Sequence, residues 1–289
     1  MVALKLKLTD KADCLTVRLG GIRITTHGKA SAMKAHIVLA HPEGNSYNGR
    51  LAQTSERTLR AHGFEVTVSD LYRMGFDPCE AGRHYHERAD DTVFHAQTEQ
   101  RFNAQNGSTP SDVAAEADRL LAADVLVVHF PLWWFGAPAI LKGWMDRVFV
   151  YGKVYKSQMR YDAGICRGRK MIACMTTGAS EDACSFNGQE GDTRLITWPI
   201  LFPFRYIGFD VLEPVILHGI GGVASIEAHE DGMSDLDRYE ETWKAVLSEV
   251  DRRRAVPFNA DTDFDARKRL TPDAPSYSPF ISHQKIGLW

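Results

Sequence analysis

The sequence predicts an α/β fold: a doubly wound, five-stranded parallel sheet flanked by helices, with an irregular C-terminal extension. Five short apolar runs alternate with segments whose apolar residues recur at helical spacing, the pattern of parallel strands joined by crossover helices. The 289 residues are 44% hydrophobic and 25% charged, which is typical of a globular protein rather than a disordered or fibrous one. The formal charge of −3 provides no basic surplus for binding nucleic acid.

The expected elements follow one another in a regular order. The strands are short apolar runs, at residues 35–40, 64–70, 125–130, 170–176 and 209–217. The helices have apolar residues at helical spacing, at residues 46–61, 109–123, 140–149, 194–206 and 236–253. Gly63 suits the left-handed end of the first helix, Thr109 and Pro110 suit the start of the second, and Ser234 caps the last.

Three segments lie outside this alternation. Residues 1–32 carry six basic and two acidic residues, and we expect them to be an extension, either not native or poorly ordered, that precedes a natural start at Met33. The alternative is an added edge strand, because apolar residues alternate from Val2 to Leu8. Residues 79–107 form a polar, histidine-rich insertion. The domain spans residues 33–256, and residues 257–289, with four of the twelve prolines, pack on it or on a dimer partner.

The sequence indicates no metal site, no disulfide framework and no membrane-spanning segment. The five cysteines are scattered with no CxxC pair, so a zinc site or disulfide framework is not expected, and a reducing, cytoplasmic location is the simplest interpretation. His84, His86 and the acidic residues near them suggest a solvated insertion rather than a metal site. The longest apolar runs also fall far short of the ~18–20 residues that cross a bilayer.

Ligands of doubly wound sheets bind beyond the carboxyl ends of the strands, so the chemistry is expected in three loops. The first, residues 41–48, opens a helix directly after a strand, where free backbone amides and the helix dipole bind anions such as phosphate. An ordinary capped helix start is the alternative. Neither GxGxxG nor GxxxxGK[ST] is present.

The second loop, residues 131–138, places three consecutive aromatic residues between two prolines. Flat side chains there favour a platform for a planar ligand, with a hydrophobic plug as the alternative. The third loop begins Thr176-Thr177-Gly178-Ala179-Ser180, whose small side chains leave backbone amides accessible to a ring edge that gains negative charge. The coincidence of all three loops at one edge of the sheet is a stronger signal than any single loop.

These loops closely resemble the NAD(P)H:quinone oxidoreductases, the flavodoxin-like family of DT-diaphorase and modulator of drug activity B. The resemblance covers residues 35–243. It rests on several motifs, which are Ala40-His41-Pro42-Glu43 with Ser46-Tyr47-Asn48, Phe130-Pro131-Leu132 with Trp134-Phe135-Gly136, Pro138-Ala139-Ile140-Leu141-Lys142-Gly143-Trp144, Thr176-Thr177-Gly178, Trp198-Pro199-Ile200 and Gly208-Phe209.

The resemblance implies bound FAD rather than FMN, NAD(P)H as co-substrate, and a homodimer with active sites at its interface. It implies ping-pong transfer of hydride from NAD(P)H through the flavin to a quinone. The residues implied to hold the FAD diphosphate are His41, Ser46, Tyr47 and Asn48. Those implied to border the flavin ring are Pro131, Leu132, Trp133, Trp134, Phe135, Thr176, Thr177, Gly178, Ala179 and Cys184. Catalytic roles fall to Trp134, Phe135, Tyr155 and Glu190, with Tyr155 presented to the partner subunit's pocket.

The chain departs from the family pattern after the glycine loop. Cys184 and Glu190 stand where well-known members have a Tyr and a His that carry charge and protons. A thiol is a weak donor, and a carboxyl is a poor proton donor at neutral pH unless burial raises its pKa. Ala179 replaces a second glycine, and the larger Trp133 replaces a glutamine at the flavin's edge. We therefore expect hydride transfer to persist with the proton relay absent or replaced by water.

Three functions remain open at this point. The leading one is two-electron reduction of a quinone or a similar planar acceptor. The alternatives are a flavodoxin-like carrier of single electrons and a catalytically weak flavoprotein with a regulatory role. The sequence does not distinguish NADH from NADPH, and it does not identify the physiological acceptor.

Overall fold

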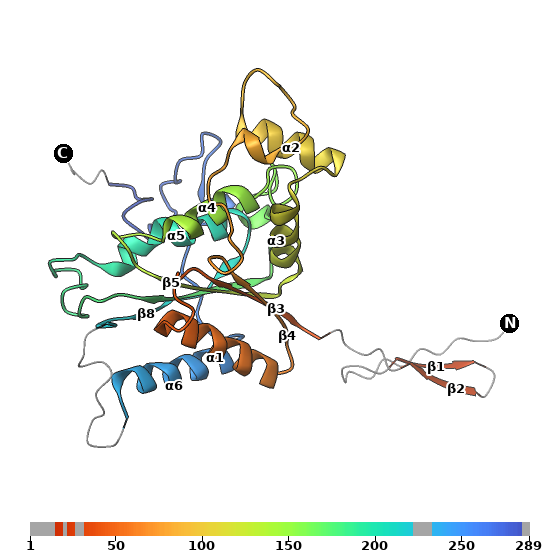
Figure 1. Cartoon of the computed structure of the whole chain (residues 1–289). Coiled ribbons are helices and arrows are strands. Elements are labelled where there is room, and N and C mark those ends of the chain that lie inside the picture. Colours follow the sequence, from red (N-terminus) through yellow and green to blue (C-terminus); the bar gives the residue numbers. More distant parts are fainter. Residues whose placement is uncertain (1–14, 20–21, 27–31, 222–232, 285–289) are drawn as a thin grey trace.

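A computed structural model describes residues 15–19, 22–26, 32–221 and 233–284. Near the N-terminus, β1 (Leu15–Leu19) and β2 (Ile22–Thr26) pair antiparallel in a two-stranded sheet of their own (Figure 1). The main sheet contains neither of them. The alternating run from Val2 to Leu8 lies outside the described residues.

The main sheet is parallel throughout and confirms the predicted fold class. Its strands are β3 (Lys34–Leu39), β4 (Glu65–Asp70), β5 (Val125–Pro131), β6 (Lys170–Thr176), β7 (Asp210–Val211) and β8 (Val215–Leu217). The order is β4-β3-β5-β6-β7, and β8 also pairs with β6. The strand order therefore reverses direction next to β3, the switch point at which ligands of such sheets bind.

The expected fifth strand is divided into β7 and β8. Pro214 has no backbone N–H to give to the sheet, and the N–H of Glu213 donates instead to the carbonyl of Arg254 at 2.9 Å. The chain rejoins β6 at Val215. A run that reads as one strand is thus interrupted where a proline meets the C-terminal segment.

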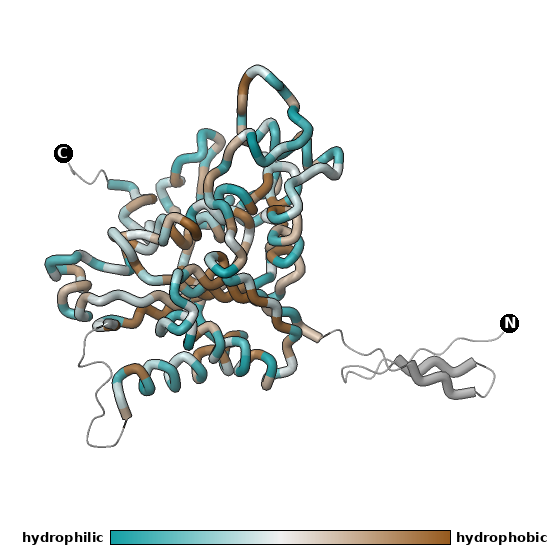
Figure 2. The backbone as a smooth tube through the Cα atoms, in the orientation of Figure 1, coloured by the Kyte–Doolittle hydropathy of each residue, from teal (hydrophilic) through white to brown (hydrophobic). Residues whose placement is uncertain are grey.

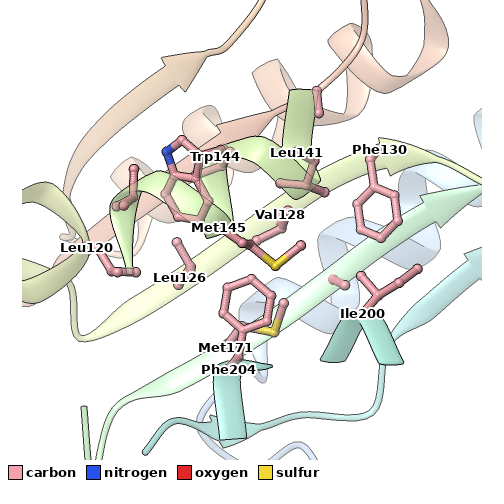
Figure 3. Packing of buried hydrophobic residues seen from close by; sticks show 14 of the residues in the cluster. Leu120, Leu126, Val128, Phe130, Leu141, Trp144, Met145, Met171, Ile200 and Phe204 are labelled. Atoms are coloured by element: carbon pink, nitrogen blue, oxygen red, sulfur yellow. The ribbon is translucent and has the colours of Figure 1, made fainter. Parts of the chain in front are cut away.

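Helices cover both faces of the sheet (Figure 1). On one face lie α1 (Tyr47–Ala61) and α6 (Asp235–Ser248). On the other lie α3 (Ser111–Ala122), α4 (Ala139–Val148) and α5 (Thr193–Tyr206). The central strands are the most apolar part of the chain (Figure 2), because each is buried on both sides. Figure 3 shows Trp144 and Met145 of α4 and Phe204 of α5 packed over Val128 and Met171 of the strands.

One helix was not expected. The insertion at residues 79–107 contains α2 (Ala96–Asn106), and Gly107 ends it with φ 71°. Its buried positions are the polar residues Glu99, Gln100 and Asn103, so no apolar stripe marks it. Glu99 receives hydrogen bonds from the guanidinium of Arg88 at 2.9 Å and from a backbone amide at 2.8 Å. Polar contacts, rather than an apolar face, hold this helix against the rest of the insertion.

Two other helix limits differ from expectation. The helix expected from Thr109 begins at Ser111, with Pro110 in the cap position and no side-chain cap. The last helix ends at Ser248 rather than at residue 253. Its start is as predicted, because Ser234 and Asp237 form a reciprocal capping box.

Two groups of buried polar side chains lie beside the strands. The carboxylate of Glu116 accepts hydrogen bonds from Ser69 at 2.8 Å and from the indole of Trp144 at 2.9 Å, and it lies 3.9 Å from Nε2 of buried His36. On the opposite face, Ser55 contacts Nε2 of His129 at 2.8 Å and accepts from Trp243 at 2.8 Å. Burial lowers the pKa of His36 to about 4 and that of His129 to about 3, so both rings are neutral at pH 7.

The described part of the C-terminal tail lies on α5 and on the segment before β6. Phe280 stacks on Trp198 with ring centroids 4.7 Å apart, and Arg205 donates to the carbonyl of Asn259 at 3.2 Å. Apart from one short 3₁₀ turn (Asp261–Asp263), this tail is irregular. Within the described part of the chain, no helix is long and apolar enough to cross a membrane.

Candidate functional site

Three loops meet at one edge of the sheet because β3, β5 and β6 are parallel neighbours whose carboxyl ends coincide. The first and third loops are joined by a hydrogen bond from Nδ2 of Asn48 to Oγ1 of Thr176 at 2.8 Å. The first and second loops meet where the rings of His41 and Trp133 lie 6.0 Å apart. The N–H of Leu132 donates to the carbonyl of Thr176 at 2.8 Å, which joins the second and third loops. The structure thus brings together the loops that the sequence indicated.

The first loop ends in a capped helix with free amides. Ser46 is the N-cap of α1, and its hydroxyl oxygen accepts the N–H of Gly49 at 3.2 Å. The backbone N–H groups of Tyr47 and Asn48 have no acceptor among the described residues. They sit at the positive end of the α1 dipole, so this turn can bind an anion. The phenol of Tyr47 donates to the carbonyl of Leu236 at 2.5 Å, which holds this side chain against α6.

His41 is held by the backbone that follows it. Its Nδ1 lies 3.0 Å from both the N–H and the carbonyl of Glu43. Its Nε2 has no partner within the described residues and is available to a ligand. The ordinary helix-start role and a ligand role are therefore compatible for this ring.

Asn48 carries an unsatisfied polar atom in the centre of the site. The residue is 3% exposed, and its Oδ1 has no hydrogen-bond partner in the described structure. A buried acceptor without a donor destabilises a protein by roughly 1–3 kcal/mol. A ligand that offers a hydrogen-bond donor or an ordered water here removes this penalty, so the position favours binding.

The second loop is a tight turn in a strained conformation. The N–H of Trp133 donates to the carbonyl of Gly136 at 3.0 Å, and the N–H of Gly136 donates back to Trp133 at 3.0 Å. Trp134 and Phe135 occupy the two central positions with φ of 51° and 59°. Both angles are in the left-handed region, which favours Gly and Asn and which L-residues adopt at a cost of about 1–2 kcal/mol. Strain of this kind is concentrated at functional sites.

The same turn presents its aromatic rings to solvent. The Trp134 side chain is 96% exposed and the Phe135 side chain is 59% exposed, so neither is a hydrophobic plug. Their backbone N–H groups have no acceptor among the described residues. The turn therefore offers flat apolar faces and two amide donors in one place, which suits a planar ring with polar edges.

The third loop has fewer free amides than the sequence suggested. The N–H of Thr177 donates to the carbonyl of Leu217 at 2.9 Å, and the N–H of Ala179 donates to Oγ1 of Thr177 at 3.3 Å. Within the part of the chain described, only the amide of Gly178 among these three has no acceptor. Two of the amides at the start of this loop are thus engaged within the protein and are not available to a ligand.

Cys184 and Glu190 lie farther along the third loop. Cys184 is buried, and burial together with the negative charge of Glu190 raises the pKa of its thiol. Glu190 is exposed, and its N–H donates to the carbonyl of Ala183 at 2.9 Å. The Glu190 side chain is therefore open to solvent in this chain.

Tyr155 lies apart from the three loops. It lines a groove of about 830 Å³ between α4 and α5, where Tyr206 and Trp198 also contribute. Its hydroxyl oxygen accepts a hydrogen bond from Nε2 of Gln97 at 3.1 Å, and burial raises its pKa. The groove begins at Ala137, directly after the strained turn. Gln97 belongs to the unexpected α2, and the glycine that ends this helix is the signal that could have revealed it.

The residues at this sheet edge fit a flavin nucleotide. The α1 amides suit its phosphates, and the exposed aromatic turn suits its planar ring. The unpaired Oδ1 of Asn48 and the free amide of Gly178 suit polar groups between them. Among the described residues, no group of three or more His, Cys, Asp or Glu side chains could hold a metal ion.

Comparison with known proteins gives matches along most of the chain. Residues 33–242 match a family model described as a flavodoxin-like fold. The chain is 40% identical over 190 residues to NAD(P)H dehydrogenase (quinone) 1 of Rattus norvegicus, covering 65% of this chain and 69% of that protein. It is 36% identical over 233 residues to ribosyldihydronicotinamide dehydrogenase (quinone) of Homo sapiens, covering 80% of this chain and 97% of that protein.

A solved structure gives a similar result. A Klebsiella pneumoniae protein with a provisional assignment as a quinone reductase superposes with a TM-score of 0.73 and 26% identity. The superposition covers 89% of this chain and 98% of that one. The similarity in structure therefore extends over most of this chain.

Proposed function

We propose that this chain, which belongs to the flavodoxin-like fold family that includes the quinone dehydrogenases, is an NAD(P)H dehydrogenase (quinone). The names of two relatives support this proposal. One is an NAD(P)H dehydrogenase (quinone) and the other a ribosyldihydronicotinamide dehydrogenase (quinone), so both names specify a quinone. The reaction is a two-electron reduction of a quinone or a similar planar acceptor.

The observation that carries the proposal is the strained turn at Trp134 and Phe135. Two large aromatic residues are held at positive φ and exposed to solvent, beside an anion-binding helix start. A protein that only needed to fold would place Asn or Gly in this turn and bury the rings. The arrangement is useful when a planar ligand covers these faces.

We propose that the cofactor is FAD rather than FMN. This proposal rests on the family resemblance of the three loops. His41, Ser46, Tyr47 and Asn48 would hold its diphosphate, and the turn at Trp133–Phe135 with Gly178 would border its ring. When bound, a flavin accepts hydride from a reduced nicotinamide and passes it to an acceptor. Trp134 and Phe135 would stack on this ring and orient it for hydride transfer.

We further propose a homodimer in which Tyr155 acts across the interface. Within one chain, Tyr155 lies in the α4–α5 groove and makes no hydrogen bond or ring contact with Trp134 or Phe135. A second copy that placed its groove over the turn would enclose the acceptor between two aromatic walls. Sedimentation equilibrium tests this: a monomer that still reduces quinones would refute it.

Rapid-mixing absorbance under anaerobic conditions tests the proposed activity. The flavin-loaded protein is mixed with NADPH or NADH and then with a quinone. Rapid bleaching in one two-electron step, followed by reoxidation by the quinone, is expected. Parallel lines in double-reciprocal plots would support ping-pong transfer, and release and analysis of the flavin would identify FAD. No bleaching would indicate a regulatory flavoprotein, and stepwise one-electron reduction would indicate an electron carrier.

A further inference from the structure

The groove beside the strained turn continues into a second, larger cavity. The groove of about 830 Å³ runs from Ala137 along α5, and a cavity of about 1180 Å³ lies at its far end, under the C-terminal tail. The two share Trp198 and Phe202 as lining residues. Together they form a trough that runs from Ala137 to the tail, and in the proposed homodimer the groove of one copy lies over the turn of the other. A ligand with a planar part near the turn can therefore extend into the tail cavity.

The two ends of this trough differ in charge. The charged residues of the groove are Glu80, Lys142 and Asp146, and Lys142 is paired with Asp146 at 2.5 Å. The tail cavity is lined by four strong cations, Arg160, Arg205, Lys268 and Arg269, and by two carboxylates, Asp261 and Asp265. The near end thus carries no net positive charge, whereas the far end does.

Two of the four cations have no carboxylate partner. Arg205 pairs with Asp162 and Arg269 with Asp265, so their charges are compensated. No carboxylate among the described residues lies within 4.0 Å of Arg160 or of the Lys268 ammonium. Asp261 acts on Arg160 only at longer range. These two side chains are therefore the ones available to an anionic ligand.

Arg160 is positioned where the groove and the tail cavity meet. Its guanidinium donates to the hydroxyl of Tyr206 at 3.2 Å and lies 5.5 Å from the centroid of that ring. Tyr206 lines the groove, whereas Arg160 lines the tail cavity. Only part of the guanidinium is used by Tyr206, and the remaining N–H donors can bind a carboxylate or sulfonate.

Lys268 is held in place by a tight, strained turn. Its φ is 61°, in the left-handed region where Asn or Gly is preferred. Its N–H donates to the carbonyl of Asp265 at 2.9 Å, and the side chain of Asp265 accepts two further backbone amides of the turn, from Arg267 and Arg269. The turn thus fixes the backbone of Lys268 beside the tail cavity, which this residue lines.

We propose that the acceptors of this chain are planar aromatic quinones that carry an anionic group, and that Arg160 and Lys268 bind that group. The inference rests on the proposed quinone reductase function and names its substrate class. The aromatic part lies in the groove beside Tyr206 and Trp198, and the anion lies in the tail cavity. Hydride transfer is that of the proposed function, and binding of the anion adds no chemical step.

A matched pair of acceptors tests the proposal. One is a 1,4-naphthoquinone with a side-chain carboxylate, and the other is its methyl ester, which has the same ring and no charge. We expect kcat/KM to be about 10-fold higher for the acid at low salt, and this preference to shrink at high salt as the charges are screened. Equal values for the two acceptors at low salt would overturn the inference while leaving the reductase function intact.

Three variants assign the preference to these residues. Lys268→Asn removes one charge and suits the positive φ, so the fold is retained, and the acid-to-ester ratio should fall about threefold. Adding Arg160→Gln should bring the ratio close to 1. Arg267→Gln removes a neighbouring exposed charge that does not line the cavity, and the ratio should remain that of the unmodified protein. A ratio that falls equally in Arg267→Gln would show a nonspecific effect of surface charge and refute the proposal.

Binding without turnover separates the inference from the function on which it rests. Calorimetric titration of the flavin-loaded protein with the acid and the ester should show the same preference, and its loss in the double variant. If neither quinone is reduced but the acid binds more tightly, the reductase function fails and the anion site stands. If the double variant changes the KM for NADPH and leaves the acid-to-ester ratio unaltered, the cations bind the donor and the proposal is wrong.

Discussion

Replacing Trp134 by glycine is expected to stabilise the flavin-free protein while weakening its affinity for flavin. Trp134 has a φ of 51°, and its side chain is 96% exposed. A natural protein rarely gains stability from the loss of a tryptophan, because the ring is usually buried. Here almost no burial is lost, and the backbone strain is relieved.

The size of the effect follows from two opposing terms. The left-handed conformation costs an L-residue about 1–2 kcal/mol, which glycine does not incur. Glycine adds about 0.5–1 kcal/mol of conformational entropy to the unfolded chain, which opposes the gain. The net stabilisation is therefore about 0.5–1 kcal/mol, or about 1–4 °C in Tm for a domain of this size.

Thermal unfolding of flavin-free protein measures the first effect, and fluorescence titration with flavin measures the second. Phe186→Gly is the matched control, because Phe186 is 81% exposed and lies outside the positive-φ region. It should lower Tm, since only the entropy term applies. Loss of stacking should weaken flavin binding about 10-fold in Trp134→Gly. A Trp134→Gly protein as unstable as Phe186→Gly would show that strain is not stored in this turn.

Three other predictions concern the loops and the core. Gly49→Ala would place a methyl group 2.0 Å from the carbonyl oxygen of Gly44, so it should displace the first loop and weaken flavin binding at least ~10-fold, whereas Gly44→Ala meets open space and should not. Burial lowers the pKa of His36 to about 4 and that of His129 to about 3, so the free energy of unfolding should fall as the pH drops below about 6.5 and the unfolded chain takes up protons. Urea unfolding at pH 5 should show a loss of about 2 kcal/mol for each ring. In His36→Asn the part of this loss that is due to His36 should disappear. Glu190→Gln should leave the rate of flavin reduction by NADPH unchanged from about pH 5 to about pH 9, because Glu190 is exposed. A decrease of ~10²-fold in this rate would instead show that Glu190 transfers a proton.

Most of the sheet and its long helices could be predicted because they obey simple periodicities. Strands β5 and β6 are buried on both faces and are therefore continuously apolar, and α1 and α6 carry Ser46 and Ser234 as caps. The meeting of the three loops also follows from the sequence, because parallel strands end at one edge. Local rules and the fold agree at these positions.

The parts that could not be predicted depend on contacts between distant residues. Helix α2 buries Glu99 and Gln100 in polar networks, so no hydrophobic period reveals it. The free charges of Arg160 and Lys268 become a pair only when the tail folds over α5. The sequence likewise gives no sign that Trp134 adopts a left-handed conformation, because its turn ends in a glycine that could have provided the flexibility.

Several exceptions to local rules lie close together at the edge of the sheet where the three loops meet, and their proximity argues for a ligand there. The orphaned Oδ1 on Asn48 and the two strained aromatic residues each destabilise the flavin-free fold, and the free amides of Tyr47 and Gly178 lie beside them. Because one flavin nucleotide can satisfy the amides, the carboxamide and the aromatic faces together, binding relieves several penalties at once. Flavin should therefore bind more tightly, and raise the free energy of unfolding more, than it would in a site whose polar groups were already paired.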